Sequence, residues 1–513
     1  MAVTTFAAID IGSYNVSMEI FEITRKNGLK SLNSLRRSLE LGRDAYSKKR
    51  ITMDSLNALT EILKDYSRIM QEFGVAGYRA CAKSAFREAR NSQLVREHIR
   101  KKTGIAIDVL SNSEQRFLGY KSIASRGEEF QKTIEKGTAI VDVGGGSIQI
   151  SLFDKDVLLT TQNIPIGSLR VSERLSSFEN ETTRLDELMD QFIRKDVLSF
   201  KRMYLKDRNI DTIILVGDYF TNLVFQNRLD ISKSETKEEF IRWYEHIIAL
   251  PARQAAEELG VSMEVARAIL PTAVTYRRLI EVLGASNIWL PGIQLTDGIA
   301  YDYAERNKLI KSTHDFDRDI LNAARNIAKR YAGNKPHTDK LIQVAGTIFD
   351  AMKKGNSLNA RDKLLLTVAC QLHDCGKYIS LVNISDCSYS IIKTTEIIGL
   401  SDAEREIIAS AVRYLASPMP FYSEISKFTA MTESEFIRMS QLVAIMRLSN
   451  CMDQSYLQKI ADIKAVRKEE KLVITVETGM DFTLEKGIFR ENMEFFEETF
   501  DVKPVLKIRK QLN

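Results

Sequence analysis

Two short apolar runs, at residues 6–9 and 139–143, each lead into a glycine turn and then into a stretch where apolar and polar residues alternate. The alternating apolar positions are Val16, Met18 and Ile20 after the first turn, and Ile148, Ile150 and Leu152 after the second. A continuous apolar run is typical of a buried strand, and alternation is typical of a half-buried partner strand. Each pattern therefore predicts a β-hairpin.

The hairpins open two regions in which strand and helix patterns alternate. Residues 1–125 also contain a helical pattern at 55–73 and a strand-like run at 77–82. Residues 126–308 contain a further apolar run at 212–216 that again leads into a glycine. Both regions are therefore expected to be α/β domains.

The pattern changes twice in the remaining chain. Strand signals vanish over residues 309–455, where helical periodicity dominates, so an all-α domain is expected. Residues 456–513 read as a small α+β domain, with strands at 471–476 and 502–508 around a helix at 486–500.

The two hairpin turns carry the same residues at the same offsets: Asp10, Gly12 and Phe21 in the first, and Asp142, Gly144 and Phe153 in the second. Glycine has no Cβ, so a ligand oxygen can approach the main-chain N–H groups, which form an anion-binding nest. The recurrence favours a two-sided phosphate site over two unrelated β-turns. The phosphate-binding residues would be Gly12, Ser13, Gly144, Gly145, Gly146 and Ser147, and the two Asp residues would face a divalent metal.

Composition restricts the remaining possibilities. The chain has 513 residues, 44% of them hydrophobic, which is enough for several cores. Its 73 basic and 68 acidic residues give a net charge of +5, too small to indicate a nucleic-acid partner. No apolar run is long enough for a membrane span, and the five cysteines form no paired motif, so a cytoplasmic protein with reduced thiols is expected.

Five blocks in a fixed order carry a resemblance to a known family: residues 10–13, 82–91, 110–114, 142–147 and 164–170. In this order they resemble the exopolyphosphatase and guanosine pentaphosphate phosphohydrolase (Ppx/GppA) family. The resemblance implies duplicated domains of the actin/hexokinase/Hsp70 (ribonuclease H-like) fold, followed by an HD-like helical domain. It also implies a phosphoanhydride hydrolase that is commonly a homodimer.

The resemblance assigns roles to individual residues. Glu114 matches the catalytic glutamate that would activate water, a contribution of about 10²–10⁴-fold. Arg87 matches an arginine suited to bidentate phosphate contact. Asp10 and Asp142 would hold Mg²⁺, or Mn²⁺, largely through water molecules.

Two positions depart from the family pattern. Gln149 stands where a glutamate is usual; it cannot act as a base, although it can orient a water molecule. Lys83 stands where a threonine is usual, and it would either attract a phosphate chain or point outward.

A second set of residues, His337, His373 and Asp374, matches the metal-binding pattern of HD phosphohydrolases. Asn450 stands where a further acid is expected, and Asp453 lies on a different face of the predicted helix. We therefore expect a degenerate HD-like site in which His373 and Asp374 form a hydrogen-bonded core pair.

The sequence thus predicts an exopolyphosphatase that releases terminal phosphate from inorganic polyphosphate. Guanosine pentaphosphate ends in the same phosphoanhydride and is the alternative substrate. A protein that binds polyphosphate or a guanosine polyphosphate without turnover is the alternative from another class, suggested by Gln149 and the decayed HD pattern.

Overall fold

The computed structural model describes residues 3–13, 15–178, 181, 184–217, 235–260, 263–312, 314–353 and 356–510. The chain forms two compact units, Met1–Asp315 and Phe316–Asn513. The sequence pattern had placed a division after residue 308.

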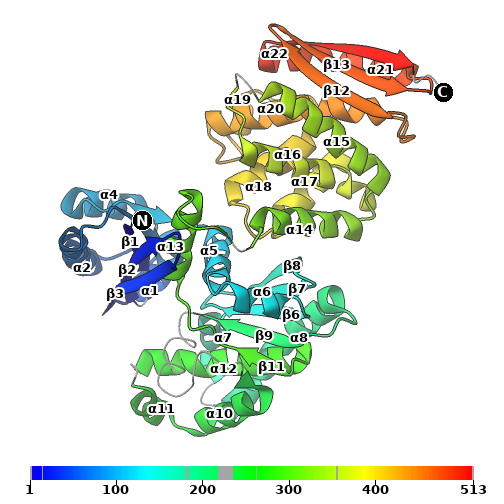
Figure 1. Cartoon of the computed structure of the whole chain (residues 1–513). Coiled ribbons are helices and arrows are strands. Elements are labelled where there is room, and N and C mark those ends of the chain that lie inside the picture. The colour runs from blue at the N-terminus through cyan, green and yellow to red at the C-terminus, as the bar shows by residue number, and fades with distance from the viewer. Residues whose placement is uncertain are drawn as a thin grey trace. The chain divides into compact units, whose positions relative to one another are not determined.

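The first half of the N-terminal unit is built on a mixed sheet with strand order β3-β2-β1-β4-β5 (Figure 1). Strands β1, β2 and β3 are antiparallel neighbours, whereas β4 and β5 run parallel to β1. The strands are β1 (Thr4–Ile11), β2 (Asn15–Thr24), β3 (Gly28–Ser38), β4 (Gly77–Ala82) and β5 (Ile107–Val109), and the helices are α1 (Leu41–Lys48), α2 (Met53–Glu72), α3 (Ser84–Glu88), α4 (Ser92–Thr103), α5 (Asn112–Ala124) and α6 (Glu128–Ile134).

The second half repeats this topology. Its sheet has the order β10-β11-β9-β6-β7-β8, so β8, β7, β6, β9 and β11 correspond to β3, β2, β1, β4 and β5 in both neighbours and direction. The strands are β6 (Thr138–Val143), β7 (Ile148–Asp154), β8 (Val157–Ile164), β9 (Thr212–Val216), β10 (Glu235–Thr236) and β11 (Asn287–Trp289). The helices are α7 (Ser168–Leu175), a 3₁₀ turn (Ser176–Phe178), α8 (Leu185–Phe200), a π-helical turn (Lys201–Leu205), α10 (Lys237–Ala249), α11 (Ala252–Leu259) and α12 (Met263–Leu283).

The last helix of the N-terminal unit, α13 (Leu295–Arg306), returns to the first half. Ile299, Ala300 and Ala304 of this helix are buried against Phe6 and Phe21 of the first sheet. The predicted division at residue 126 had assigned these positions to the second half. The helix packs there because the first sheet presents a second apolar face, which α13 covers together with Leu118 of α5.

The C-terminal unit begins with helices, as predicted, and the described residues between 316 and 453 contain no strand. They form α14 (Phe316–Arg330), α15 (Lys335–Met352), α16 (Ala360–Leu372), a 3₁₀ turn (Cys375–Tyr378), α17 (Ile384–Thr394), α18 (Asp402–Arg413), α19 (Tyr422–Ile425), α20 (Glu433–Asn450) and a 3₁₀ turn (Cys451–Asp453). The burial of α20 on many sides suits a central helix, since Met439, Leu442, Ile445 and Met446 are all inaccessible to solvent.

The end of the chain forms a sheet of order β12-β13-β14 with two helices. The elements are β12 (Asp462–Lys468), β13 (Lys471–Thr478), α21 (Thr483–Glu491), α22 (Met493–Phe500) and β14 (Lys503–Lys510). The single helix predicted over residues 486–500 is divided at Asn492, which ends α21 and begins α22. Strand β12 was not predicted, because Ile463 is its only buried residue and the apolar Val466 is exposed, so it shows no sustained alternation of apolar and polar positions.

Candidate functional site

The two glycine turns have the same main-chain construction. The N–H of Gly12 donates to the carbonyl of Asn15 at 2.8 Å, and the N–H of Gly144 donates to the carbonyl of Ser147 at 3.0 Å. In the two ladders Asp10 is paired with Ser17, and Asp142 is paired with Gln149. The duplication inferred from sequence is therefore also present in the hydrogen bonding and register of the turns.

Each turn is supported by the helix that follows its third strand. Gly42 of α1 donates its N–H to the carbonyl of Ser13 at 2.7 Å, and Ser168 of α7 donates to the carbonyl of Gly144 at 3.0 Å. Gly167 is required for this contact, because a Cβ there would lie 2.3 Å from the Gly144 oxygen.

The second turn leaves main-chain donors available for an anion. Gly145 accepts a hydrogen bond from the Arg170 N–H at 3.1 Å, so its carbonyl is directed toward α7. The N–H groups of Gly145 and Gly146 donate to no acceptor within the described part of the chain. Successive free N–H groups of this kind form a nest that can bind phosphate oxygens.

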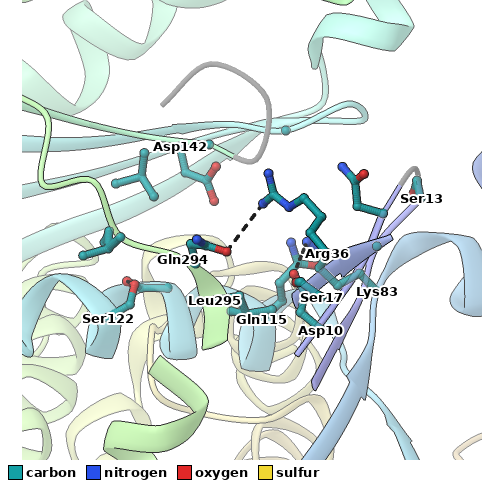
Figure 2. A pocket seen from close by; sticks show the side chains of 17 residues that line it. Asp10, Ser13, Ser17, Arg36, Lys83, Gln115, Ser122, Asp142, Gln294 and Leu295 are labelled. Atoms are coloured by element: carbon teal, nitrogen blue, oxygen red, sulfur yellow. Dashed lines mark hydrogen bonds and ion pairs between the residues drawn. The ribbon is translucent and has the colours of Figure 1, made fainter. Parts of the chain in front are cut away.

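Two adjoining cavities connect the turns. Both are lined by Ser13, Lys83, Gln115, Asp142 and Gly144. Figure 2 shows Asp10 and Lys83 on one side of the first cavity and Asp142 on the other. The structure therefore brings the two predicted Asp residues and the two predicted turns to one cleft.

The lining of this cleft is predominantly cationic. The basic side chains that line one or both cavities are Arg36, Lys83, Arg87, Arg116 and Arg170, and the acidic ones are Asp10, Glu88 and Asp142. Glu88 is itself paired with Lys49 at 2.8 Å. The cleft thus suits a ligand with several negative charges.

Lys83 points into the cleft rather than outward. It is 5% exposed, and its Nζ lies 3.1 Å from Oδ2 of Asp10. This ion pair does not fit the predicted use of Asp10 as a metal ligand, because an ammonium group stands beside the carboxylate. Within the described residues, no three His, Cys, Asp or Glu side chains form a metal-binding group. Asp142 remains a predicted metal ligand.

Arg87 is held at the entrance of α5 by three acceptors. Its Nη1 donates to the Leu110 carbonyl at 2.7 Å and to Oε1 of Gln115 at 3.2 Å, and its Nη2 donates to Oδ1 of Asn112 at 2.7 Å. Arg87 also lines the second cavity. These contacts fix the guanidinium before any ligand arrives, which lowers the entropic cost of binding a phosphate.

The structure gives the two residues at 114 and 115 different surroundings. The Glu114 carboxylate accepts the Ser111 N–H at 2.9 Å and completes a capping box at the start of α5. It is not among the residues that line either cavity, whereas Gln115 lines both. The proposed base therefore caps a helix here, and the side chain that faces the cleft is an amide that sequence reasoning missed.

Gln149 also faces the cleft. It is 7% exposed, lines the second cavity, and stands opposite Asp142 across β6 and β7. Gln115 and Gln149 therefore approach the cleft from different halves of the unit. Each amide can both donate to and accept from a water molecule, but neither can take up a proton.

Comparison with known families identifies the chain. The model of the Ppx/GppA phosphatase family matches residues 20–307, and the model of domain III of the same family matches residues 321–493. The chain belongs to the Ppx/GppA phosphatase family. The match covers both compact units, so the C-terminal helices are also part of the family architecture.

Individual relatives are distant. Exopolyphosphatase 1 of Mycobacterium bovis is 22% identical over 347 residues, which cover 64% of this chain and 98% of that protein. A bifunctional 3-dehydroquinate synthase/phosphatase of Fusobacterium nucleatum is 22% identical over 243 residues, which cover 45% of this chain and only 35% of that protein.

Solved structures agree on the fold. A Ppx/GppA family member of Aquifex aeolicus has a TM-score of 0.51 at 20% identity and covers 60% of this chain and 99% of its own. An exopolyphosphatase of Cytophaga hutchinsonii has a TM-score of 0.52 at 18% identity and covers 60% of this chain and 100% of its own. The fold of this family member is thus the actin-like fold with mixed sheets. Among the described residues, no helix has both the length and the apolar character needed to cross a bilayer.

The C-terminal unit of this Ppx/GppA family member gathers the predicted HD-like residues. The His337 ring is fully buried, 5.2 Å from the His373 ring between centroids. Its Nδ1 lies 2.8 Å from Oδ2 of Asp453, and its Nε2 lies 3.1 Å from Oδ1 of Asn450. Both nitrogens of His337 are therefore used by protein contacts.

His373 and Asp374 do not form the predicted hydrogen-bonded pair. Nδ1 of His373 bonds the Cys370 carbonyl at 2.8 Å, and Oδ2 of Asp374 accepts the Asn334 N–H at 3.5 Å. Burial is the main cause that lowers the pKa of His373 to about 4, so this ring is neutral at pH 7. The side chains are brought together, but they do not form a metal-binding group within the described residues.

Proposed function

We propose that this protein releases terminal orthophosphate from inorganic polyphosphate by hydrolysis of the phosphoanhydride bond. The observation that carries the proposal is the pair of equivalent glycine turns, which line one cationic cleft from two duplicated halves. The family consists of phosphatases, and one relative is named an exopolyphosphatase.

The residues of the cleft have two roles in the proposed reaction, phosphate binding and positioning of water. The main-chain N–H groups of Gly145 and Gly146 and the Arg87 guanidinium bind the oxygens of the terminal phosphate. Gln115 and Gln149 orient a water molecule toward its phosphorus. The water oxygen forms the new P–O bond, the bridging P–O bond breaks, and the proton of the water passes to a phosphate oxygen, since neither amide can take it up. Phosphoryl transfer depends mainly on positioning and on charge stabilisation, so an amide that aims the water is sufficient for turnover.

Polyphosphate is favoured over guanosine pentaphosphate by the lining of the cleft. Arg116 and Arg170 line the same cavity as the Gly145–Gly146 turn, so a longer phosphate chain bound at that turn would meet further cations. Neither cavity is lined by Phe or Trp among the described residues, and Tyr46 is the aromatic side chain that lines the second one. Guanine would need a stacking or hydrogen-bonding pocket, whereas polyphosphate needs only repeated cations.

The test measures orthophosphate release from long-chain polyphosphate and from guanosine pentaphosphate in the presence of Mg²⁺, with wild type and Arg87→Met. Loss of the guanidinium should lower kcat/KM by about 10- to 100-fold, the effect of one hydrogen bond to a charged group. Arg90→Met is the matched control, because Arg90 is exposed and lines neither cavity. Equal rates for both variants would refute the assignment of the cleft.

A second function is favoured by one specific observation. The carboxylate of Glu114 is used to cap α5, and the side chains that face the cleft at positions 115 and 149 are amides. If hydrolysis here needs a base as well as a positioned water molecule, this cleft binds polyphosphate without turnover and acts as a sensor. Tight binding of polyphosphate with no orthophosphate release from either substrate would establish this function instead.

A further inference from the structure

We propose that Lys83 supplies the positive charge beside Asp10 and that its ammonium binds the terminal phosphates at the position where the family pattern implied a divalent cation. The inference rests on the proposed phosphate-binding function of the cleft and specifies which group neutralises the negative charge of Asp10 there. It concerns a residue at which this chain departs from the family pattern.

The position of the ammonium is the first support. Nζ of Lys83 lies 3.1 Å from Oδ2 of Asp10, and the Lys83 side chain is 6% exposed. Its Cε and Nζ lie 3.5 and 3.7 Å from the point that a Cβ on Gly12 would occupy. Lys83 therefore lies over the first glycine turn, at van der Waals distance from the place that a Cβ on Gly12 would take.

Main-chain hydrogen bonds of both the N–H and the carbonyl of Lys83 hold this residue in place. The Lys83 N–H donates to the carbonyl of Ile11 at 3.2 Å, directly before the first turn. The Lys83 carbonyl accepts from the N–H groups of Phe86 and Arg87 at 3.1 and 3.2 Å, which begins helix α3. Lys83 is thus tied to the end of β1 and to the start of the helix that carries Arg87.

Lys83 and Arg87 together form a cationic pair from one segment. Both line the second cavity, which the Gly144–Ser147 turn also lines. Lys83 also lines the first cavity, so it borders both cavities of the cleft. A phosphate bound there would meet an ammonium, which is a compact donor of three hydrogen bonds, next to a planar guanidinium.

The same geometry disfavours a divalent cation on Asp10. Such an ion would bind a carboxylate oxygen at about 2 Å and would then stand close to the ammonium, with which it shares the sign of its charge. Asp10 is already neutralised by Lys83, so it has little to gain from a second cation. The consequence is a cleft that binds a phosphate chain with a weak requirement for metal on the Asp10 side.

Tripolyphosphate binding, measured by titration calorimetry with excess EDTA and again with Mg²⁺, tests the inference on the full chain. Wild type should bind in EDTA, and Lys83→Met should bind about tenfold or more weakly there but recover when Mg²⁺ is added. Lys83→Arg should keep binding in EDTA. Lys102→Met, at an exposed position on α4 outside both cavities, should behave as wild type.

Mn²⁺ binding to the ligand-free protein, followed by electron paramagnetic resonance, gives a readout that does not depend on turnover. Lys83→Met should bind Mn²⁺ about tenfold more tightly than wild type, because Asp10 is released, and Lys83→Met with Asp10→Asn should lose that gain. Tryptophan fluorescence checks that the variants are folded. If Lys83→Met does not fold, wild type and Lys83→Arg in EDTA still decide the question.

The outcomes separate this inference from the proposed function. Wild-type binding that needs Mg²⁺, with Mn²⁺ affinity equal in wild type and Lys83→Met, overturns the role of Lys83 and leaves the phosphate cleft in place. Absence of tripolyphosphate binding under every condition rejects both the role of Lys83 and the phosphate-binding cleft. Binding in EDTA without any orthophosphate release supports the role of Lys83 and rejects the hydrolase.

Discussion

Asp297, at the start of α13, should make the stability of the N-terminal unit fall as the pH rises. Its carboxylate accepts the Gln294 N–H at 2.7 Å and caps the helix next to the cleft. Burial, and then the charge of Glu19, raise the pKa of Asp297 to about 6 from 3.8. The folded state therefore binds a proton more tightly than the unfolded state, and stability is lost as the pH rises through about 6.

The pKa difference gives the size of the effect. About two pH units at 1.36 kcal/mol each correspond to about 3 kcal/mol of stability lost above pH 7, and to well below 1 kcal/mol at pH 4. Asp297→Asn removes the ionisation but keeps an oxygen that can accept the Gln294 N–H. The substitution should therefore stabilise the unit by about 3 kcal/mol at pH 8 and have little effect at pH 4.

Urea unfolding followed by tryptophan fluorescence measures this difference in the correct unit, because both tryptophans, Trp243 and Trp289, lie in the Met1–Asp315 unit. Wild type and Asp297→Asn are compared at pH 8, 6 and 4. A gain that is the same at pH 4 and pH 8 would show that charge is not its cause. A loss of stability at pH 8 would refute the reasoning.

Three other substitutions test the site and the C-terminal unit. Gln149→Glu places a carboxylate in the cleft, and if this carboxylate acts as a general base the steady-state rate of orthophosphate release should rise by about 10²-fold. An unchanged rate would exclude proton transfer at this position. Gly167→Ala places a Cβ 2.3 Å from the Gly144 oxygen, so it should weaken tripolyphosphate binding, measured by calorimetry, by about tenfold or more. The circular dichroism spectrum should stay unchanged, and an unchanged affinity would mean that the turn tolerates displacement. Asp453→Ala leaves Nδ1 of buried His337 without its acceptor and should destabilise the C-terminal unit by about 2 kcal/mol in thermal unfolding. Phosphate release from a short substrate should stay within about twofold of the wild-type rate, and loss of that release would instead give these residues a part in catalysis.

The hairpins were predictable because their signals are local. The apolar run, the glycine and the alternating strand occur within about twenty residues, and the pairing of Asp10 with Ser17 follows from the turn length. The same argument at the second turn places Gln149 opposite Asp142, as the structure has it.

A local sequence signal distinguishes the orientations of residues 114 and 115. Ser111 and Glu114 have the spacing of a capping box, which directs the glutamate back to the helix start. The next residue lies about 100° further round the helix and faces a different direction. This spacing could have indicated that Gln115, rather than Glu114, reaches the cleft.

The direction of Lys83 and the packing of α13 could not be read from local pattern. Lys83 faces inward because β4 runs parallel to β1 with Ala82 beside Ile11, a pairing between segments far apart in the chain. Ile299 covers the first sheet after the chain has passed through the entire second half. Both features depend on long-range contacts, which the spacing of apolar residues does not encode.

Hydrogen–deuterium exchange with and without tripolyphosphate tests the two-sided cleft most directly. The ligand should slow exchange in the peptides that cover residues 10–17 and 142–149 together, because the main-chain N–H groups of both turns bind one phosphate chain. Arg87→Met should weaken the protection of both peptides in parallel. Protection of one turn alone, or of neither at a concentration that saturates binding, would contradict the account.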